Sequence, residues 1–369
     1  MKLIADRMRK IDSSGIRKVF DLAQKMKDPV SLSIGQPDFD VPEVLKEEAI
    51  AAIRQGFNRY TVTQGIPELI LAVKEHLERK RNVRAEEVLI TSGVSGGLML
   101  AMLVLINPGD EVLIPDPYFV MYKHLVNVMG GVPVYYDTYP DFHLRREALE
   151  GKVSAKTKIL ILNSPSNPTG VLFGREELHM AADFAKAHDL LILSDEIYDA
   201  FVYEKEYVSV GSLYPKTLTL NGFSKSHAMT GWRLGYAAGP GEIIREMTKM
   251  QQFSFVCAPS FAQKAGVKAL STLPSKEIAQ YKLKRDFIFG QLKEFLNVTK
   301  PDGAFYIFPE APGGRGDELV VKAIEKGLLV IPGSVFSERA THFRISYAAT
   351  METLQRGVAI LREIGRQHT

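Results

Sequence analysis

Residues 224–233 (Ser-Lys-Ser-His-Ala-Met-Thr-Gly-Trp-Arg) place a lysine in a setting that suits covalent chemistry. Lys225 comes shortly after the apolar run 217–220, which has the composition of a buried strand. A lysine near the end of a buried strand is costly unless its charge is neutralised or bonded. A desolvated amine of lowered pKa is a nucleophile, and one use for it is a Schiff base. The alternative, a surface lysine in a glycine-rich loop, stays open on this stretch alone.

Other polar residues that could do chemistry lie directly after, or within, short apolar runs of the sequence. Residues 93–95 (Gly-Val-Ser), Asn167 and Asp195 each come after such a run, as Lys225 does, and Arg344 lies within one. Taken singly, each has an ordinary structural explanation: a strand-to-helix turn, turn chemistry, a helix N-cap or an ion pair. Taken together, they supply a phosphate cradle, an amide, a carboxylate, a lysine and an arginine.

This set of groups matches the requirements of one cofactor. The phosphate of pyridoxal phosphate is held well by backbone N–H groups at a helix N-terminus together with an arginine. Its pyridine nitrogen needs a carboxylate that keeps it protonated, and its aldehyde needs a lysine. We therefore expect pyridoxal 5′-phosphate as the cofactor, and no metal site.

The elements that must position these residues are short apolar strands separated by helices. Strands that are apolar on both faces are typical of a mostly parallel sheet covered by helices on both sides. Ligands of such sheets bind at the carboxyl ends of the strands, where the candidate residues lie. The predicted fold class is therefore α/β. The expected strands of its large sheet are 88–90, 112–114, 132–136, 159–162, 190–193, 217–220 and 234–238.

The chain of 369 residues exceeds the usual size of one hydrophobic core, which favours two domains. We expect an N-terminal arm with one helix, which forms part of the small domain, over residues 1–42. A large cofactor-binding domain over 43–262 and a C-terminal small α+β domain over 263–369 would follow. The expected strands of the small domain are 30–34, 304–308, 328–331 and 343–347.

The composition argues against several classes of partner. The net charge of +3, without a dense basic run, argues against nucleic acid. The one cysteine, Cys257, excludes an internal disulfide framework and fits a reducing compartment. The sequence lacks the roughly 18 consecutive apolar residues of a membrane helix and the apolar stretch of a signal peptide. We therefore expect a cytoplasmic protein without a membrane partner.

The chain resembles the class I and II aminotransferases of the fold-type I pyridoxal-phosphate family. The similarity is to the prokaryotic branch that contains many aspartate, alanine and aromatic aminotransferases, and it covers nearly the whole chain. Its blocks are Gly35-Gln36-Pro37-Asp38-Phe39, Arg59-Tyr60-Thr61, Ser166-Asn167-Pro168-Thr169-Gly170, Ser194-Asp195-Glu196-Ile197-Tyr198, and Ser224-Lys225 with Thr230-Gly231-Trp232-Arg233-Leu234-Gly235.

The resemblance implies transfer of an amino group from an L-amino acid to a 2-oxo acid, commonly 2-oxoglutarate. The route would be a Lys225 aldimine and a pyridoxamine phosphate intermediate, with Lys225 moving a proton between the substrate Cα and the cofactor C4′. Asp195 would pair with the protonated pyridine nitrogen. Tyr198 and Asn167 would hydrogen-bond the cofactor 3′-oxygen.

The resemblance also implies how the rest of the cofactor is bound. Arg233 and the N–H groups of Val94 and Ser95 would hold the phosphate. Phe119 aligns with the aromatic residue that stacks on the pyridine ring, and Tyr118 is the neighbouring alternative.

The substrate and the partner subunit would be bound by further residues of the same pattern. Arg344 would clamp the substrate α-carboxylate through two hydrogen bonds, with Asn167 and the Gly35 backbone nearby. Tyr60 would reach the phosphate of the partner subunit, so the active unit would be a homodimer.

Two positions depart from the family pattern. Many relatives carry a hydroxyl residue three positions before the lysine to bind phosphate, and here that position is Gly222; Ser224 is the candidate replacement. One aspartate-specific subgroup carries a lysine in the phosphate loop, and here that position is Ser95. The second departure weakens a strict aspartate assignment and leaves aromatic, alanine or broad 2-oxo acid specificity open.

Two other functions compete with transamination. A β-elimination lyase uses the same scaffold and cofactor. A ligand-sensing domain of a transcription regulator has the same fold behind an N-terminal DNA-binding domain. About 30 residues precede the Gly35 strand, so we expect no such DNA-binding domain here.

Overall fold

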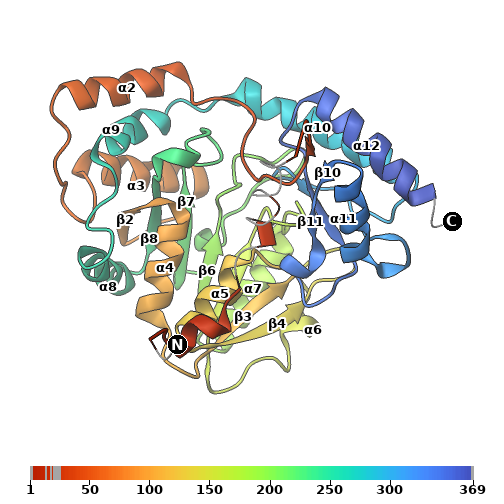
Figure 1. Ribbon diagram of the computed structural model, residues 1–369. Coiled ribbons are helices and arrows are strands. Elements are labelled where there is room, and N and C mark those ends of the chain that lie inside the picture. The colour runs from red at the N-terminus through yellow and green to blue at the C-terminus, as the bar shows by residue number, and fades with distance from the viewer. Residues whose placement is uncertain (1–2, 13–14, 17–18, 20–25, 367–369) are drawn as a thin grey trace.

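The computed structural model describes residues 3–12, 15–16, 19 and 26–366, and Figure 1 shows a helix-covered sheet beside a smaller unit. Within these residues the large sheet has seven strands in the order β2-β8-β7-β6-β5-β3-β4. β8 is antiparallel to both of its neighbours, and the other pairs are parallel, so the predicted α/β class is confirmed. The strands are β2 (Glu87–Thr91), β3 (Glu111–Asp116), β4 (Val132–Asp137), β5 (Thr157–Asn163), β6 (Leu191–Asp195), β7 (Thr217–Gly222) and β8 (Gly235–Gly239).

Helices lie on both faces of this sheet (Figure 1). In chain order they are α2 (Glu43–Arg54), α3 (Pro67–Arg81), α4 (Gly93–Leu105), α5 (Met121–Val128), α6 (Arg146–Leu149), α7 (Arg175–Ala187), α8 (Gly241–Gln252) and α9 (Ser260–Ala269). A short 3₁₀ helix, η1 (Asp6–Lys10), precedes them. The helix expected in the N-terminal arm falls largely outside the described residues. No helix in the described part of the chain is long and apolar enough to cross a membrane.

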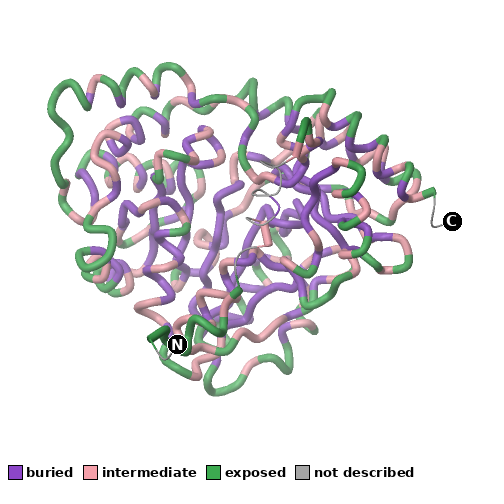
Figure 2. Tube along the Cα trace, viewed as in Figure 1, coloured by how far each residue is buried: buried purple, intermediate pink, exposed green. Residues whose placement is uncertain are grey.

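Successive residues of a strand pack against different helix layers, because their side chains point to opposite faces of the sheet. Ile159 and Ile161 of β5 lie in one buried cluster with α4, α5 and α8. Leu160 and Leu162 lie in another with α7. Figure 2 shows the strands of the large sheet as mostly buried trace. Both faces are covered, which explains why these strands are continuous apolar runs in the sequence.

The candidate residues converge because four strands end at the same edge of the sheet. β5, β6 and β7 are parallel neighbours, and they end at Asn163, Asp195 and Gly222. β2 runs antiparallel to β8, which runs antiparallel to β7, so β2 also points the same way. Its last residue, Thr91, leads directly into α4.

The smaller unit combines the segment around residue 30 with the C-terminal part of the chain. β1 (Val30–Ser31) pairs in parallel with β10 (Leu328–Leu329). A second sheet has the order β11-β12-β9 and is antiparallel. Its strands are β11 (Ile331–Pro332), β12 (Phe343–Ser346) and β9 (Tyr306–Ile307), and the helices of the unit are α10 (Ser275–Leu292), α11 (Gly316–Glu325) and α12 (Met351–Arg366). The division of the chain at residues 42 and 262 remains a prediction.

Three expected strands of the small unit are shorter than predicted. The run 328–331 divides, because Leu328–Leu329 pairs with β1 while Ile331–Pro332 pairs with β12. The run 304–308 is reduced at its start, because Ala304 has a φ of +54°, outside the extended region. The run 30–34 stops at Ser31.

Candidate active site

A cavity of about 660 Å³ lies at the carboxyl edge of the large sheet, where the two units meet. Every predicted site residue except Tyr60 lines it. These residues are Gly35, Val94, Ser95, Phe119, Asn167, Asp195, Tyr198, Ser224, Lys225, Arg233 and Arg344. The large sheet and its loops supply most of them, and the smaller unit supplies Arg344 from β12.

Lys225 joins the two units through its side chain. Its Nζ donates a 2.6 Å hydrogen bond to the carbonyl oxygen of Gly35, 190 residues away in the sequence. Burial lowers the pKa of Lys225 to about 8, and the positive charges of Arg344 and Arg233 act in the same direction. Near neutral pH, part of the population therefore carries a free amine, as a nucleophilic lysine requires.

Asp195 is the last residue of β6 and is buried. Its Oδ2 accepts a 2.7 Å hydrogen bond from the Oη of Tyr122, and its Oδ1 accepts one from the N–H of Ile197 at 3.3 Å. Burial raises the pKa of Asp195 to about 6, and the hydrogen bond from Tyr122 opposes this shift. A bound cation facing the carboxylate would bring its pKa back down and keep it ionised.

Tyr122 was missed at the sequence level. It lies three residues after Phe119, and the two rings make an edge-to-face contact with centroids 5.7 Å apart. Its place three residues after Phe119 is the signal that could have revealed it, because the N–H of Tyr122 donates to the carbonyl oxygen of Phe119 at 3.0 Å where the chain enters α5.

Arg344 is buried and faces the cavity from the small unit. Its Nη1 donates to Oδ1 of Asn167 at 2.9 Å, and its Nη2 donates to the carbonyl oxygen of Ser33 at 2.6 Å. Its Nε is buried without a hydrogen-bond partner in the described part of the chain. The guanidinium lies 4.6 Å from the ring centres of Tyr306 and Phe336, which fix its plane. A planar, oriented guanidinium with unused donor capacity suits a carboxylate ligand.

Tyr198 and Tyr306 form a second buried pair at the cavity. Their hydroxyl oxygens lie 2.8 Å apart, and burial raises the pKa of Tyr198 well above its ordinary value. Both tyrosines therefore remain protonated; one hydroxyl donates to the other, which leaves the second free to donate into the cavity. Tyr306 was not predicted, because its strand carries no motif that separates it from an ordinary core aromatic residue.

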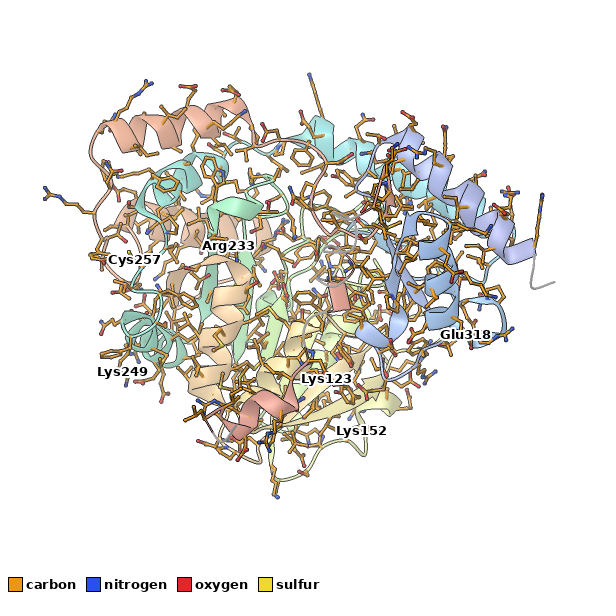
Figure 3. All side chains as sticks on the ribbon, viewed as in Figure 1. Lys123, Lys152, Arg233, Lys249, Cys257 and Glu318 are labelled. Carbon is orange, nitrogen blue, oxygen red and sulfur yellow. The ribbon has the colours of Figure 1, made fainter. Side chains whose placement is uncertain are left out.

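The first turn of α4 and Arg233 form the opposite end of the cavity. The N–H groups at the start of a helix have no acceptor within the helix, so those of Val94 and Ser95 are available to an anion. Arg233, labelled in Figure 3, has a left-handed φ of +53° and donates to the carbonyl oxygens of Thr230 at 3.0 Å and Ser92 at 3.2 Å. This end suits a phosphate group.

Gly222 is required by the packing of β7 against β8. A Cβ atom at this position would lie 2.7 Å from the Cα of Gly235 and 2.9 Å from the carbonyl oxygen of Leu234. The hydroxyl residue that many relatives carry at this place therefore does not fit here. Ser224, which lines the cavity, is the nearest hydroxyl on this segment.

Of the two neighbouring aromatic candidates, Phe119 lines the cavity. Tyr118 is turned away from it and donates a 2.7 Å hydrogen bond to Glu338. The ring of Tyr118 also stacks on Tyr135, with centroids 5.3 Å apart.

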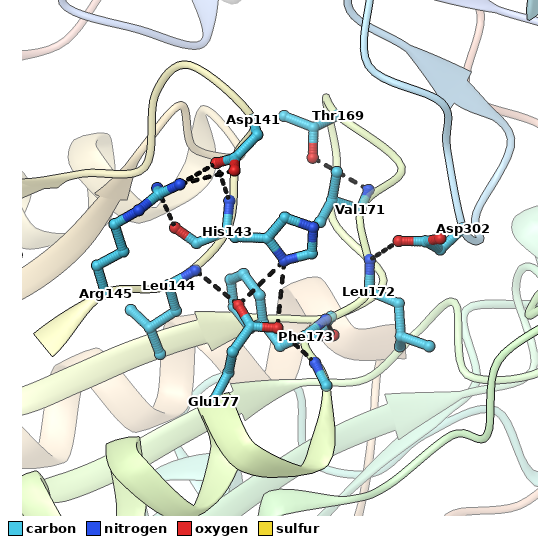
Figure 4. Close-up of polar contacts among 12 residues, drawn as sticks. Asp141, His143, Leu144, Arg145, Thr169, Val171, Leu172, Phe173, Glu177 and Asp302 are labelled. Carbon is cyan, nitrogen blue, oxygen red and sulfur yellow. Dashed lines mark hydrogen bonds and ion pairs between the residues drawn. The ribbon is translucent and has the colours of Figure 1, made fainter.

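The loop that carries Asn167 is anchored on both sides. Its N–H donates to Oδ1 of Asn163 at 2.9 Å, which ties the loop to the end of β5. Figure 4 shows how the following residues are held: Thr169 accepts from the N–H of Val171 at 3.2 Å, and Asp302 accepts from the N–H of Leu172 at 3.4 Å. Such a rigid support suits a residue that must hold a ligand in one orientation.

Tyr60 lies outside the cavity, with 83 % of its surface exposed. Within the described residues of one chain it therefore has no place in the site. Val62, two residues after Tyr60, is also a large apolar residue that is exposed. The loop after α8 exposes three more: Phe253, Phe255 and Val256.

The residues of the cavity fit pyridoxal phosphate. One end of the cavity has helix N–H groups and Arg233 for the phosphate. The carboxylate for the ring nitrogen is that of Asp195, at the end of β6, which accepts a hydrogen bond from Tyr122. Lys225 lies in the same cavity with a pKa of about 8. Each requirement of the cofactor thus has its own group in one cavity.

The sequence profile of the family "Aminotransferase class I and II" matches residues 27–361. The chain belongs to this family. Among its relatives, the probable aspartate aminotransferase of Methanocaldococcus jannaschii is 39% identical over 98% of this chain and 100% of the relative. The aromatic-amino-acid aminotransferase 2 of Thermococcus litoralis is 38% identical over 98% of each chain. The solved structure of the Thermus thermophilus aspartate aminotransferase with maleate is similar with a TM-score of 0.92 and 34% identity, and covers 99% of this chain and 100% of that one.

Family membership confirms the resemblance found in the sequence. This aminotransferase is an enzyme that transfers amino groups with pyridoxal phosphate, acting on amino acids and 2-oxo acids. The sequence-based predictions of enzyme class and cofactor are therefore confirmed.

Proposed function

We propose that this aminotransferase moves an amino group from an L-amino acid to 2-oxoglutarate, and that Lys225 carries out the proton transfer. The observation that carries the proposal is the presence of Lys225, Asp195 and Arg344 in one cavity, each held by hydrogen bonds. Relatives named for aspartate and aromatic amino acids support a broad choice of donor.

Arg344 would hold the substrate α-carboxylate, with Asn167 and the carbonyl of Ser33 fixing the guanidinium plane. The Nζ of Lys225 would then take the proton from the substrate Cα and deliver it to the cofactor carbon C4′, because its lowered pKa allows both steps near neutral pH. When bound, pyridoxal phosphate supplies an electron sink for the charge left at Cα. Asp195 would hold the proton on the ring nitrogen, and Tyr122 would orient Asp195.

Tyr198 and Asn167 would hydrogen-bond the 3′-oxygen of the cofactor. Arg233, Ser224 and the N–H groups of Val94 and Ser95 would hold its phosphate. Phe119 would stack on its ring. These roles are supported by the lining of the cavity and by the donors that each group has available.

The active unit in this proposal is a homodimer in the cytoplasm, with Tyr60 completing the site of the partner subunit. The exposure of Tyr60, Val62 and Phe253 supports a surface that a second copy covers. The single cysteine supports a reducing compartment.

The test is a substrate panel on the purified holoenzyme. Aspartate, glutamate, alanine, phenylalanine and tyrosine are each mixed with the enzyme in single-turnover experiments, and the cofactor absorbance is followed. At least one donor should change the absorbance, and 2-oxoglutarate should reverse the change. Release of pyruvate and ammonia without a 2-oxo acid would instead favour β-elimination.

A further inference from the structure

A second cavity, of about 450 Å³, lies behind the Lys225 segment. It shares no lining residue with the active-site cavity, although Phe223, Ser226 and His227 border it and Ser224 and Lys225 border the active site. The two cavities therefore contact the same short segment through different side chains. We call the second one the rear cavity.

The charged groups of the rear cavity leave a positive surplus. Arg81 donates two hydrogen bonds to Oδ2 of Asp199, at 3.0 and 2.6 Å, so these two charges neutralise each other. Lys80 also lines the cavity and has no acidic partner in the part of the chain that the structure describes. Burial lowers the pKa values of His76 and His227, so both histidines are neutral near pH 7. The surplus charge is therefore that of Lys80, which favours an anionic ligand.

The rest of the wall is mostly apolar, with Asn221, Ser226 and Ser271 as its uncharged polar residues. Tyr236 and Phe223 are buried core residues, whereas Leu273 is 50 % exposed although it is a large hydrophobic residue. An exposed leucine beside a cavity leaves apolar surface for a ligand to cover. The further apolar lining residues are Ala200, Ala269 and Leu270.

A hydrogen-bonded chain connects the rear cavity to the catalytic segment. The ring of His227 lies 2.9 Å from the carbonyl oxygen of Ala269 through Nε2, which must therefore carry the proton. Its Nδ1 then accepts from the hydroxyl of Ser226 at 2.8 Å. Ser226 follows Lys225 directly, so the chain ties the lysine segment to the end of α9. A ligand in contact with this chain would restrict the movement of the segment.

We propose that the rear cavity binds small carboxylates with an apolar body and that the bound carboxylate steadies the Lys225 segment. The carboxylate pairs with Lys80, and the apolar body covers Leu273, Phe223 and Tyr236. The site is independent of which amino acid the enzyme uses as donor, so its test does not depend on the substrate proposal.

The test uses phenylacetate as the probe with the holoenzyme in titration calorimetry. Phenylacetate carries neither an amino nor an oxo group, so it binds without reacting. We expect two binding events per chain: one that 2-oxoglutarate displaces and one that it does not. Lys80→Gln should weaken the second event by about tenfold and leave the first unchanged, because one exposed charge pair with a carboxylate is lost.

Two controls separate this result from a general charge effect. Lys152→Gln changes an exposed lysine outside the cavity (labelled in Figure 3) and should leave both events intact. Phenylacetamide, the neutral analogue, should not produce the second event. A single displaceable event, or a second event of equal strength in Lys80→Gln, would overturn the proposed site.

The effect on the segment is measured by hydrogen exchange with mass spectrometry. Phenylacetate should slow exchange in peptides covering 223–229 of the parent enzyme, and at the same phenylacetate concentration this protection should be smaller in Lys80→Gln. Equal protection in the parent and in Lys80→Gln would overturn the coupling.

Discussion

The Oη of Tyr122 donates a 2.7 Å hydrogen bond to Oδ2 of Asp195, and both side chains are buried. The bond joins α5 to the end of β6 and holds the carboxylate at the edge of the sheet. It favours the ionised form of Asp195, against the burial that raises the pKa of this residue to about 6.

Tyr122→Phe should therefore raise the pKa of Asp195 further and lower kcat by roughly 10-fold to 100-fold, because a buried carboxylate oxygen loses its donor. The acidic limb of the kcat pH profile should move to higher pH. NMR of labelled aspartate in the cofactor-free protein checks the pKa separately from activity. A variant with an unchanged profile and an unchanged Asp195 pKa would contradict the positioning role.

Arg344→Ala should raise KM for all α-carboxylate substrates by about 100-fold and leave the cofactor bound. The guanidinium is the donor that faces the cavity, and the cofactor contacts proposed above do not include it. The measurements are KM for two donors and one acceptor, with cofactor content by absorbance. Arg315→Ala, which changes an exposed arginine outside the cavity, is the control. Loss of cofactor would show that Arg344 has a structural role instead.

Asp195 should make the stability of the cofactor-free protein depend on pH. Its pKa rises from 3.8 to about 6 on folding, so the native state binds this proton more tightly than the unfolded state. The free energy of unfolding should then fall as the pH rises from about 4 to about 6, and the loss should persist above that range, by roughly 3 kcal/mol.

Asp195→Asn should remove this dependence and be more stable than the parent at pH 7, because the amide can still accept from Tyr122 without carrying a charge. Urea unfolding between pH 4 and 8 measures both quantities. Asp183→Asn, on the exposed side of α7, should keep the parental dependence. Identical pH dependence in Asp195→Asn and the parent would refute the assignment.

Subunit complementation tests the proposed role of Tyr60. Lys225→Ala and Tyr60→Ala homodimers should each be strongly impaired. A mixed dimer would hold one site with an intact lysine and an intact tyrosine from the partner, so mixing should restore up to about a quarter of the parental activity. The measurement is activity after unfolding and refolding the two variants together. Mixtures that only average the two separate activities would place Tyr60 outside the partner's site.

Gly222→Ser should destabilise the protein by roughly 2 kcal/mol or more, because its Cβ would meet the backbone of Gly235 at 2.7 Å. Gly231→Ser is the matched control, since a Cβ there meets nothing within 4 Å. Urea unfolding compares the two variants. If Gly222→Ser were as stable as Gly231→Ser, β7 and β8 would have to separate enough to admit a hydroxyl residue at position 222.

Much of the fold follows from local pattern. The strands of the large sheet are apolar on both faces because both faces are covered, so their positions in the sequence are readable without knowledge of their neighbours. The small unit was less predictable. The run 328–331 divides between two sheets, and Ala304 adopts a left-handed conformation, because strand pairing with distant segments overrides the local pattern.

The sequence by itself determined which chemistry this protein carries. Lys225 and Asp195 follow apolar strands that end at one edge, and the direction of parallel strands brings such ends together wherever the sheet forms. Only the tertiary structure decided how these groups are tuned. Three hydrogen bonds join segments that are far apart in the chain: Tyr122 to Asp195, Lys225 to Gly35, and Arg344 to Ser33. Such bonds depend on distances of tenths of an ångström. Residue spacing carries no information at that scale, because such distances are set by the packing of two units against each other.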